Sequence, residues 1–222
     1  MLAFKTALMK RFILFLLCIS GLLFSGCDRN VITSTSNVNF QLKAAISPIN
    51  GATINWNAGS AGVYSAKILG KKNDSSSVEF ASTPNINIDL FGMLNITSVA
   101  IPKGTYRNVQ FKMELHDIGG KPQLHLEGTY TAAGISTPIS FDASSTLFIS
   151  AAKDSIVIDA NTSNYTAITT VGLGTLTSGV TEADLKAADR TAGKIVISAS
   201  SNILVYNKII ANLAKNQIIE FK

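Results

Sequence analysis

The sequence contains only two cysteines, and neither lies beyond position 27. Cys18 and Cys27 both belong to the start of the 222-residue chain. The residues after Cys27 can therefore form no disulfide among themselves and supply no thiolate to a zinc site. This shortage excludes the small disulfide-rich domains and the zinc-thiolate domains as the class of the folded part.

Charged residues are also scarce, at 15% of the chain, and no basic run exceeds two residues. Three of the 19 basic residues and none of the 14 acidic residues lie in residues 1–26, which leaves 16 basic against 14 acidic. Such a balance lacks the clustered positive charge of nucleic-acid-binding proteins. We therefore predict no nucleic-acid partner.

The common catalytic motifs are missing as well. No serine lies in a Gly-x-Ser-x-Gly pattern. Gly172-Leu-Gly174 lacks the lysine and the spacing of a phosphate-binding loop. We predict that the chain is not an enzyme and that it uses no cofactor.

A positively charged start precedes one apolar run. Lys5, Lys10 and Arg11 come before Phe12–Phe24, in which nearly every residue is apolar. A helix that spans a bilayer needs about 20 apolar residues, so this run is too short for a permanent span. Its length and its basic flank are typical of a secretory signal peptide.

The run ends in Leu22-Leu-Phe-Ser-Gly-Cys27, and small residues directly before a cysteine resemble the lipobox of bacterial lipoprotein signal peptides. The resemblance implies that residues 1–26 are removed and that Cys27 becomes the lipid-bearing first residue. The alternatives are an ordinary signal peptide cut near Gly26, which leaves Cys27 free, and an uncleaved short anchor. Two or three acyl chains would hold the protein on a membrane, since each buried CH₂ contributes about 0.8 kcal/mol.

The predicted location is accordingly the bacterial cell envelope, with the outer membrane favoured over the inner membrane and the face left open. Asp28 resembles the inner-membrane retention signal of enterobacterial lipoproteins, but other bacteria do not follow that rule, so it assigns no membrane. Residues 27–37 are a polar linker, which as a flexible coil spans roughly 15–20 Å. The folded domain, predicted as residues 38–222, would therefore sit close to the membrane.

From Val38 onward, apolar residues recur at every second position, which is typical of half-buried strands. Further strands are predicted around Ile54–Trp56, Tyr64–Ile68, Val78–Phe80, Ile86–Leu90, Leu94–Ile101, Ile139–Phe141, Thr146–Ser150 and Ile156–Asp159. Turns are expected at Pro48–Gly51, Gly59–Gly62 and Ala151–Asp154. Many short strands separated by turn signals indicate a sandwich or a barrel.

Gly119-Gly120 predicts a two-residue hairpin loop, because both glycines can take φ > 0. The register that follows pairs Leu115 with Leu124 and makes one face of the hairpin apolar. The other face then holds both histidines of the chain among Glu114, His116, His125 and Glu127. This face is a possible metal or acid–base cluster, and the alternative is an ordinary solvated strand face.

The last fifth of the chain changes character. Thr181-Glu-Ala-Asp184 has the pattern of a capping box and predicts a short helix through Ala188. Lys194–Ser198 predicts one more strand. Ile203–Ala214 has apolar residues at helical spacing, and we expect this helix to dock on the sandwich rather than lie on a membrane. The single domain thus has a helical extension over about residues 180–222.

Ile88-Asp-Leu90 and Pro102-Lys-Gly-Thr-Tyr106, with the strand that follows, resemble a family of bacterial envelope lipoproteins. Members of this family carry a domain of unknown function with a prealbumin-like or immunoglobulin-like β-sandwich. The resemblance covers about residues 38–159 and implies a fold and a location, but no known activity. The predicted fold class is therefore mainly β: an antiparallel sandwich with short C-terminal helices.

Three weaker patterns have a bland and a functional interpretation. Asp159-Ala-Asn161-Thr-Ser163 mimics the start of a calcium loop, but the later positions lack the required Gly and Glu, so a polar turn is the better interpretation. Asp154-Ser155-Ile156 resembles a bacterial O-glycosylation site at Ser155, with an ordinary turn as the alternative. Trp56, the only tryptophan, is interpreted as core, with a sugar-stacking platform as the alternative.

The leading functional hypothesis is a non-catalytic, lipid-anchored envelope protein with a binding, adhesion or structural role. Its predicted partners are the membrane, through the lipid on Cys27, and an envelope protein or glycan. The first alternative is a carbohydrate-binding module of an envelope glycan-uptake system. The second is a metal-dependent hydrolase that uses His116, His125 and Glu114. An exposed aromatic row would favour carbohydrate binding, and a buried Trp56 would count against it.

Overall fold

The structure is a computed structural model, and it describes residues 34–45, 54–92, 94–159, 161–213, 215 and 217–222. The predicted signal peptide, Cys27, most of the linker and the Pro48–Gly51 turn lie outside the described residues. The chain divides into residues 1–33 and a compact unit, Ser34–Lys222. All elements that follow belong to the second unit.

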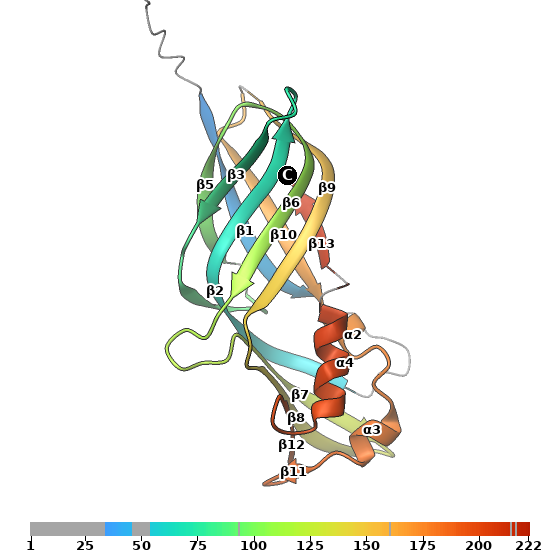
Figure 1. Cartoon of the computed structure of the whole chain (residues 1–222). Coiled ribbons are helices and arrows are strands. Elements are labelled where there is room, and N and C mark those ends of the chain that lie inside the picture. The colour runs from blue at the N-terminus through green and yellow to red at the C-terminus, as the bar shows by residue number, and fades with distance from the viewer. Residues whose placement is uncertain (1–33, 46–53, 93, 160, 214, 216) are drawn as a thin grey trace, which may run out of the picture. The chain divides into compact units, whose positions relative to one another are not determined.

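Two β-sheets make up most of this unit (Figure 1). The four-stranded sheet has the order β13 (Gln217–Phe221), β10 (Asn164–Gly172), β1 (Thr35–Ala45), β5 (Asn95–Pro102). Its β1–β10 pair is parallel, and its other two pairs are antiparallel.

The nine-stranded sheet is hydrogen-bonded in the sequence β11 (Arg190–Thr191), β12 (Lys194–Ser198), β8 (Ile135–Ala143), β7 (Leu124–Ala132), β2 (Ile54–Lys72), β6 (Gly104–Leu115), β9 (Leu147–Ile158). The strands β3 (Ser77–Ser82) and β4 (Ile86–Asp89) also pair with β2. Only β12–β8 is parallel among the pairs of this sheet. The fold class is therefore mainly β, consistent with the predicted sandwich.

β2 is one continuous strand of 19 residues, which corrects the prediction of two strands separated by a turn at Gly59–Gly62. Both glycines lie inside the strand, where a neighbouring chain passes too close for a side chain. A Cβ on Gly59 would lie 2.7 Å from Leu126 Cδ2, and one on Gly62 would lie 2.3 Å from the backbone oxygen of His116. Glycine here permits close approach and makes no turn.

The predicted hairpin register between β6 and β7 is wrong. Both strands pair with β2, β7 along Ile54–Ala61 and β6 along Val63–Lys72. At the junction the N–H of Gly62 donates to Gln123 O (3.0 Å), and the N–H of His116 donates to Gly62 O (3.0 Å). Because both groups belong to one strand residue, β6 and β7 follow one another along the same edge of β2.

Residues 116–123, here called the excursion loop, leave this line and return to it. The two-residue turn at their tip is as predicted, since Gly119 and Gly120 have φ of 66° and 76° and Ile118 pairs with Lys121. The Gly-Gly signal therefore identified a local turn but not a hairpin of long strands.

β9 is also one strand, where two were predicted with a turn at Ala151–Asp154. It pairs with β6, and β8 pairs with β7. Three long hydrogen-bonded rows of backbone therefore cross the unit. The first row is β2, the second is β7 continued in space by β6, and the third is β8 continued by β9. One half of each row belongs to a part of the unit that we call the sandwich lobe, and the other half belongs to a part that we call the helical lobe.

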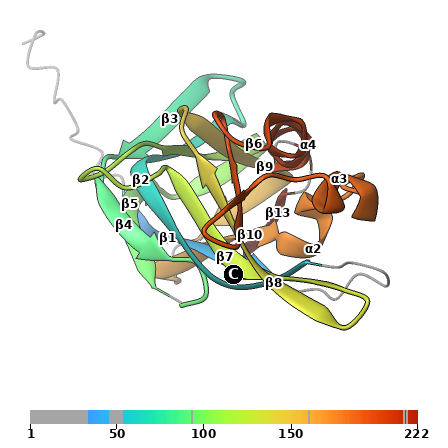
Figure 2. The ribbon, with the colours of Figure 1, turned by 90° about the horizontal axis from the view of Figure 1, so that it is seen from below.

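The sandwich lobe contains β6, β9, the second half of β2, β3, β4 and the four-stranded sheet. The helical lobe contains the first half of β2, β7, β8, β11, β12 and three helices: α2 (Leu173–Leu176), α3 (Glu182–Lys186) and α4 (Ile203–Leu213). Figure 2 shows the three helices gathered on one side of the unit.

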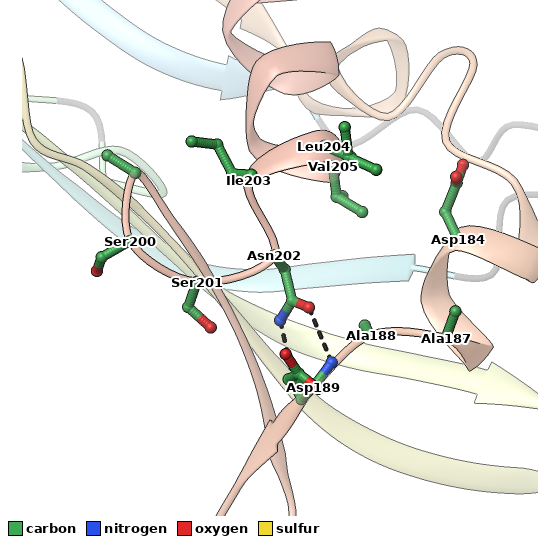
Figure 3. A pocket seen from close by; sticks show the side chains of 11 residues that line it. Asp184, Ala187, Ala188, Asp189, Ser200, Ser201, Asn202, Ile203, Leu204 and Val205 are labelled. Carbon is green, nitrogen blue, oxygen red and sulfur yellow. Dashed lines mark hydrogen bonds between the residues drawn. The ribbon is translucent and has the colours of Figure 1, made fainter.

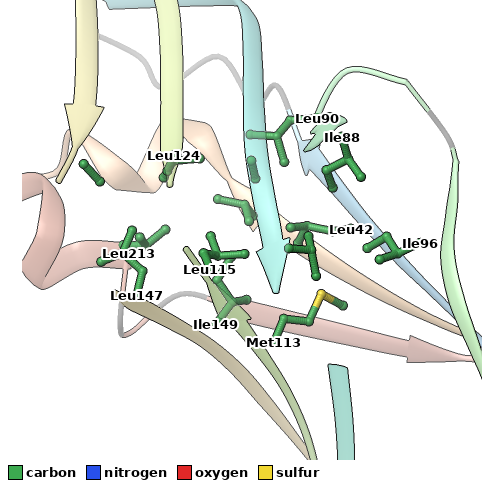
Figure 4. Packing of buried hydrophobic residues seen from close by; sticks show 14 of the residues in the cluster. Leu42, Ile88, Leu90, Ile96, Met113, Leu115, Leu124, Leu147, Ile149 and Leu213 are labelled. Atoms are coloured by element: carbon green, nitrogen blue, oxygen red, sulfur yellow. The ribbon is translucent and has the colours of Figure 1, made fainter. Parts of the chain in front are cut away.

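One hydrophobic core runs through both lobes. The close view in Figure 4 shows this packing among residues that include Leu42, Met113, Leu115, Leu124 and Leu213. Burying one such side chain contributes about 1.5–3 kcal/mol. The alternating apolar side chains of β6 and β7 thus pack in the core, although the two strands do not pair with each other as predicted.

The C-terminal predictions are largely confirmed. Thr181 and Asp184 form the predicted capping box, and α3 ends at Lys186, slightly before Ala188. α4 docks on the sheet as expected, since Tyr206 is buried and its ring stacks on Phe141 with centroids 5.6 Å apart. β10 and β13 were not predicted.

Candidate functional site

The first of the two histidines, His116, lies directly after the end of β6. His116 Nε2 is 2.8 Å from Glu114 Oε1, and the hydroxyl of Ser65 donates to the other carboxylate oxygen, Oε2 (3.2 Å). The ring of Tyr64 stacks on His116, with centroids 4.4 Å apart and planes 8° from parallel. His116 is therefore held between a carboxylate and an aromatic face.

The second histidine lies on β7 and contacts a different carboxylate. His125 Nδ1 is 2.6 Å from Asp142 Oδ1 on β8, and its Nε2 is 3.6 Å from Glu127 Oε1. Lys194 on β12 donates to the same Glu127 oxygen at 2.9 Å. This hydrogen bond is the main cause that lowers the pKa of Glu127. The four side chains form a row across three strands.

The two histidines consequently belong to separate clusters and do not share one hairpin face as predicted. The reason is the pairing of β6 and β7 with β2, which sets them end to end instead of side by side. Among the described residues, no three His, Cys, Asp or Glu side chains are grouped so as to hold a metal ion. The hydrolase alternative on His116, His125 and Glu114 stays a prediction without the geometry that motivated it.

A hollow of about 350 Å³ lies between the excursion loop, the end of β8 and the β12–α4 connection. We call it the polar hollow, because its lining includes Asp117, Gln123, Asp142, Ser144, Ser198 and Ser200. Asp117 Oδ1 accepts a hydrogen bond from the N–H of Gly120 (2.9 Å), so this carboxylate also holds the tip of the excursion loop. Asp142 links the hollow to the second histidine cluster.

A second hollow, of about 490 Å³, lies on the other side of the β12–α4 connection, between that connection and α3 (Figure 3). Asn202 ties its two walls together: the side-chain oxygen accepts from the N–H of Asp189 (2.8 Å), and the side-chain nitrogen donates to Asp189 O (3.0 Å). Ile203 and Leu204 at the start of α4 line it and are exposed. The hollow therefore has fixed walls and a partly apolar lining.

The remaining candidate residues have structural roles or lie on the surface. Trp56 is 3% exposed, so its interpretation as core is confirmed and it offers no platform. Asp159 accepts hydrogen bonds from the N–H groups of Asn161 (2.7 Å) and Thr162 (2.9 Å), which lower its pKa and make the predicted polar turn. Ser155 is exposed inside β9 opposite Arg107, in a strand and not in a turn.

Two residues of interest were missed by the sequence reasoning. Phe148 on β9 is 61% exposed, although a phenylalanine in a strand is commonly core. Its neighbours Leu147 and Ile149 are buried, so the alternation of the strand could have placed Phe148 outside. Gln123 is buried beside the polar hollow, and no sequence signal distinguishes it from any other loop glutamine.

No family model, no curated protein and no solved structure matches this chain. Within the described residues, none of the helices has the length and apolar character required to cross a bilayer.

Proposed function

We propose that the chain is a lipid-anchored protein of the bacterial cell envelope whose folded unit binds a partner and performs no catalysis. The observation that carries the proposal is the sequence Leu22–Cys27, where small residues and a cysteine directly follow a signal-like apolar run. The two-sheet, mainly β architecture agrees with the fold implied by the resemblance to envelope lipoproteins. Membership of that family is therefore part of the proposal.

The place where the linker joins the folded unit supports this role. β1 starts at Thr35 and runs parallel to β10, and α2 follows β10 directly. The helical lobe therefore lies toward the end of β1 that is opposite the linker. The residues between Cys27 and Thr35 reach about 30 Å at most when fully extended. A lipid on Cys27 would therefore keep the folded unit close to the membrane surface.

The test is membrane fractionation of the wild-type protein and of a Cys27→Ser variant expressed in a diderm bacterium. Lipidation needs the thiol of Cys27, so the wild-type protein should sediment with membranes and the variant should not. Separation of the two membranes by density should place the wild-type protein in the outer-membrane fraction.

Cys18→Ser is the matched control, because it removes the other thiol of the chain within the apolar run. It should leave the protein in the membrane fraction. A Cys27→Ser protein that stays bound to membranes as firmly as the wild type would overturn the lipid anchor and favour the uncleaved-anchor alternative.

A further inference from the structure

The outer face of the central strands carries side chains that the core does not use. Leu115 at the end of β6 and Leu124 at the start of β7 point into the core. Because side chains alternate along an extended chain, Glu114 and the first and last residues of the excursion loop, His116 and Gln123, lie on the opposite, outer face. The polar hollow and the Tyr64–His116 stack both lie on this face.

Gln123 is the clearest sign of a ligand on this face. The residue is only 8% exposed, yet its side-chain oxygen has no hydrogen-bond partner among the described residues. Its backbone oxygen is used by Gly62, and its side chain lines the polar hollow. A buried acceptor without a donor is unfavourable, and a ligand that donates a hydrogen bond would satisfy it.

The remaining lining of the polar hollow consists largely of acceptors and hydroxyls. Asp117 and Asp142 each use one carboxylate oxygen within the protein, on Gly120 and His125 respectively. Of the described residues that line the hollow, none is a lysine, arginine or histidine. This composition favours a ligand that donates several hydrogen bonds and disfavours an anion.

Two exposed aromatic rings lie on the same outer face. Phe148 follows Ser144 by one short connection, lies opposite Glu114 in the β6–β9 register and is 61% exposed. Glu114 contacts His116, which directly precedes Asp117 of the hollow and stacks on the 40% exposed Tyr64. The outer face thus carries the polar hollow and two exposed aromatic rings.

We propose that this face binds a neutral saccharide, with its hydroxyl groups in the polar hollow and an apolar C–H face on Phe148 and Tyr64. Sugars combine hydrogen-bond donors with apolar faces, and carboxylates, amides and aromatic rings complement the two. The inference rests on the proposed function as an envelope binding protein and names its ligand class. It replaces Trp56, which is buried, by residues that the sequence did not single out.

The test is isothermal titration of the detergent-solubilised full-length protein with four neutral oligosaccharides: maltotriose, mannotriose, galactobiose and chitotriose. At least one should bind with a Kd below about 1 mM, a modest affinity. Phe148→Ala should weaken that binding by at least about tenfold, and Gln123→Leu should do the same by removing the unpaired acceptor. Val157→Ala is the matched control, because Val157 is similarly exposed on the same strand, and it should leave the affinity unchanged.

Thermal melting of each variant shows whether a loss of binding is due to a loss of folding. If Gln123→Leu does not fold, the affinity of Phe148→Ala still tests the saccharide site. Absence of binding by all four sugars, or binding that Phe148→Ala leaves intact, would overturn the saccharide site. A site for a divalent cation would instead appear as Ca²⁺ binding that Phe148→Ala does not affect, which also contradicts the proposal. None of these results touches the anchor, which membrane fractionation tests separately.

Discussion

Gly62 lies at the point where the chain leaves β6 and returns as β7. Its N–H and C=O hold the two ends of the excursion loop through Gln123 and His116. A Cβ added to Gly62 would lie 2.3 Å from His116 O, a backbone atom that cannot turn away. The position of the loop, and with it the polar hollow, depends on the absence of this one side chain.

Gly62→Ala is therefore expected to destabilise the unit by about 2–3 kcal/mol or more, the range of an overpacked interior. Gly70→Ala is the matched control on the same strand, because its Cβ would meet Arg107 O at an ordinary 3.5 Å. That change should be neutral or stabilise by up to about 1 kcal/mol. Urea denaturation of both variants gives the comparison, and equal effects would contradict the close-approach account.

Residue identity alone could not separate these glycines from turn glycines. Gly59 and Gly62 resemble a turn signal because glycine serves both φ > 0 and close approach, and only the partner strand decides which. Gly119 and Gly120 do have φ > 0, and Thr181 and Asp184 do form a capping box. Signals that act within a few residues were predictable, whereas those set by a distant strand were not.

At the scale of elements, α3 and α4 are joined by one ion pair. Lys208 Nζ on α4 lies 2.6 Å from Asp184 Oδ2 on α3, and the N–H of Thr181 donates to the same oxygen at 2.7 Å. The hydrogen bond from Lys208, followed by those from Thr181, lowers the pKa of Asp184 from 3.8 to about 2. Asp184 therefore favours the folded state when it is ionised.

The stability that Asp184 contributes should be fully present above its unfolded pKa of 3.8 and should be lost as the pH falls through about 2. Asp184→Asn should accordingly lower the melting temperature near neutral pH, and the difference from the wild type should shrink between pH 4 and the folded pKa. Melting curves across this pH range provide the measurement.

Glu182→Gln is the control for that experiment. Among the described residues, the ion pair of Glu182 is with Lys186 on its own helix, at 2.7 Å and with both side chains largely exposed. An exposed pair of this kind contributes little. A wild-type advantage over Asp184→Asn that stays constant down to pH 2 would contradict the role of the Asp184 carboxylate.

The error in the β6–β7 hairpin also belongs to this scale. The alternation of Leu115 and Leu124 with polar neighbours indicates which face of each strand is buried, but it does not indicate which other strand pairs with it. In the structure both strands pair with β2 instead of with each other, because the 19 residues of β2 are long enough to pair with β7 and β6 end to end. The predicted grouping of Glu114, His116 and His125 was wrong for the same reason, because it depended entirely on the predicted hairpin register.

For the whole molecule, the fold class was predictable and the topology was not. Strand periodicity and the C-terminal helix signals give a mainly β unit with helices at its end, as observed. The parallel pairing of β1 with β10 joins residues far apart in sequence, such as Asn37 and Asn164, and no local pattern specifies it. The proposed saccharide face was likewise hidden, because it is assembled from β2, β6, β9, the excursion loop, the end of β8 and the β12–α4 connection.

The proposed lipid anchor is the central claim at this scale, because it decides where the unit works. The most direct measurement is the intact mass of the protein purified from membranes. We predict a chain that begins at Cys27 and carries the added mass of a diacylglyceryl group, with or without a further acyl chain. A mature chain with an unmodified Cys27 thiol, or one that retains residues 1–26, would contradict the account.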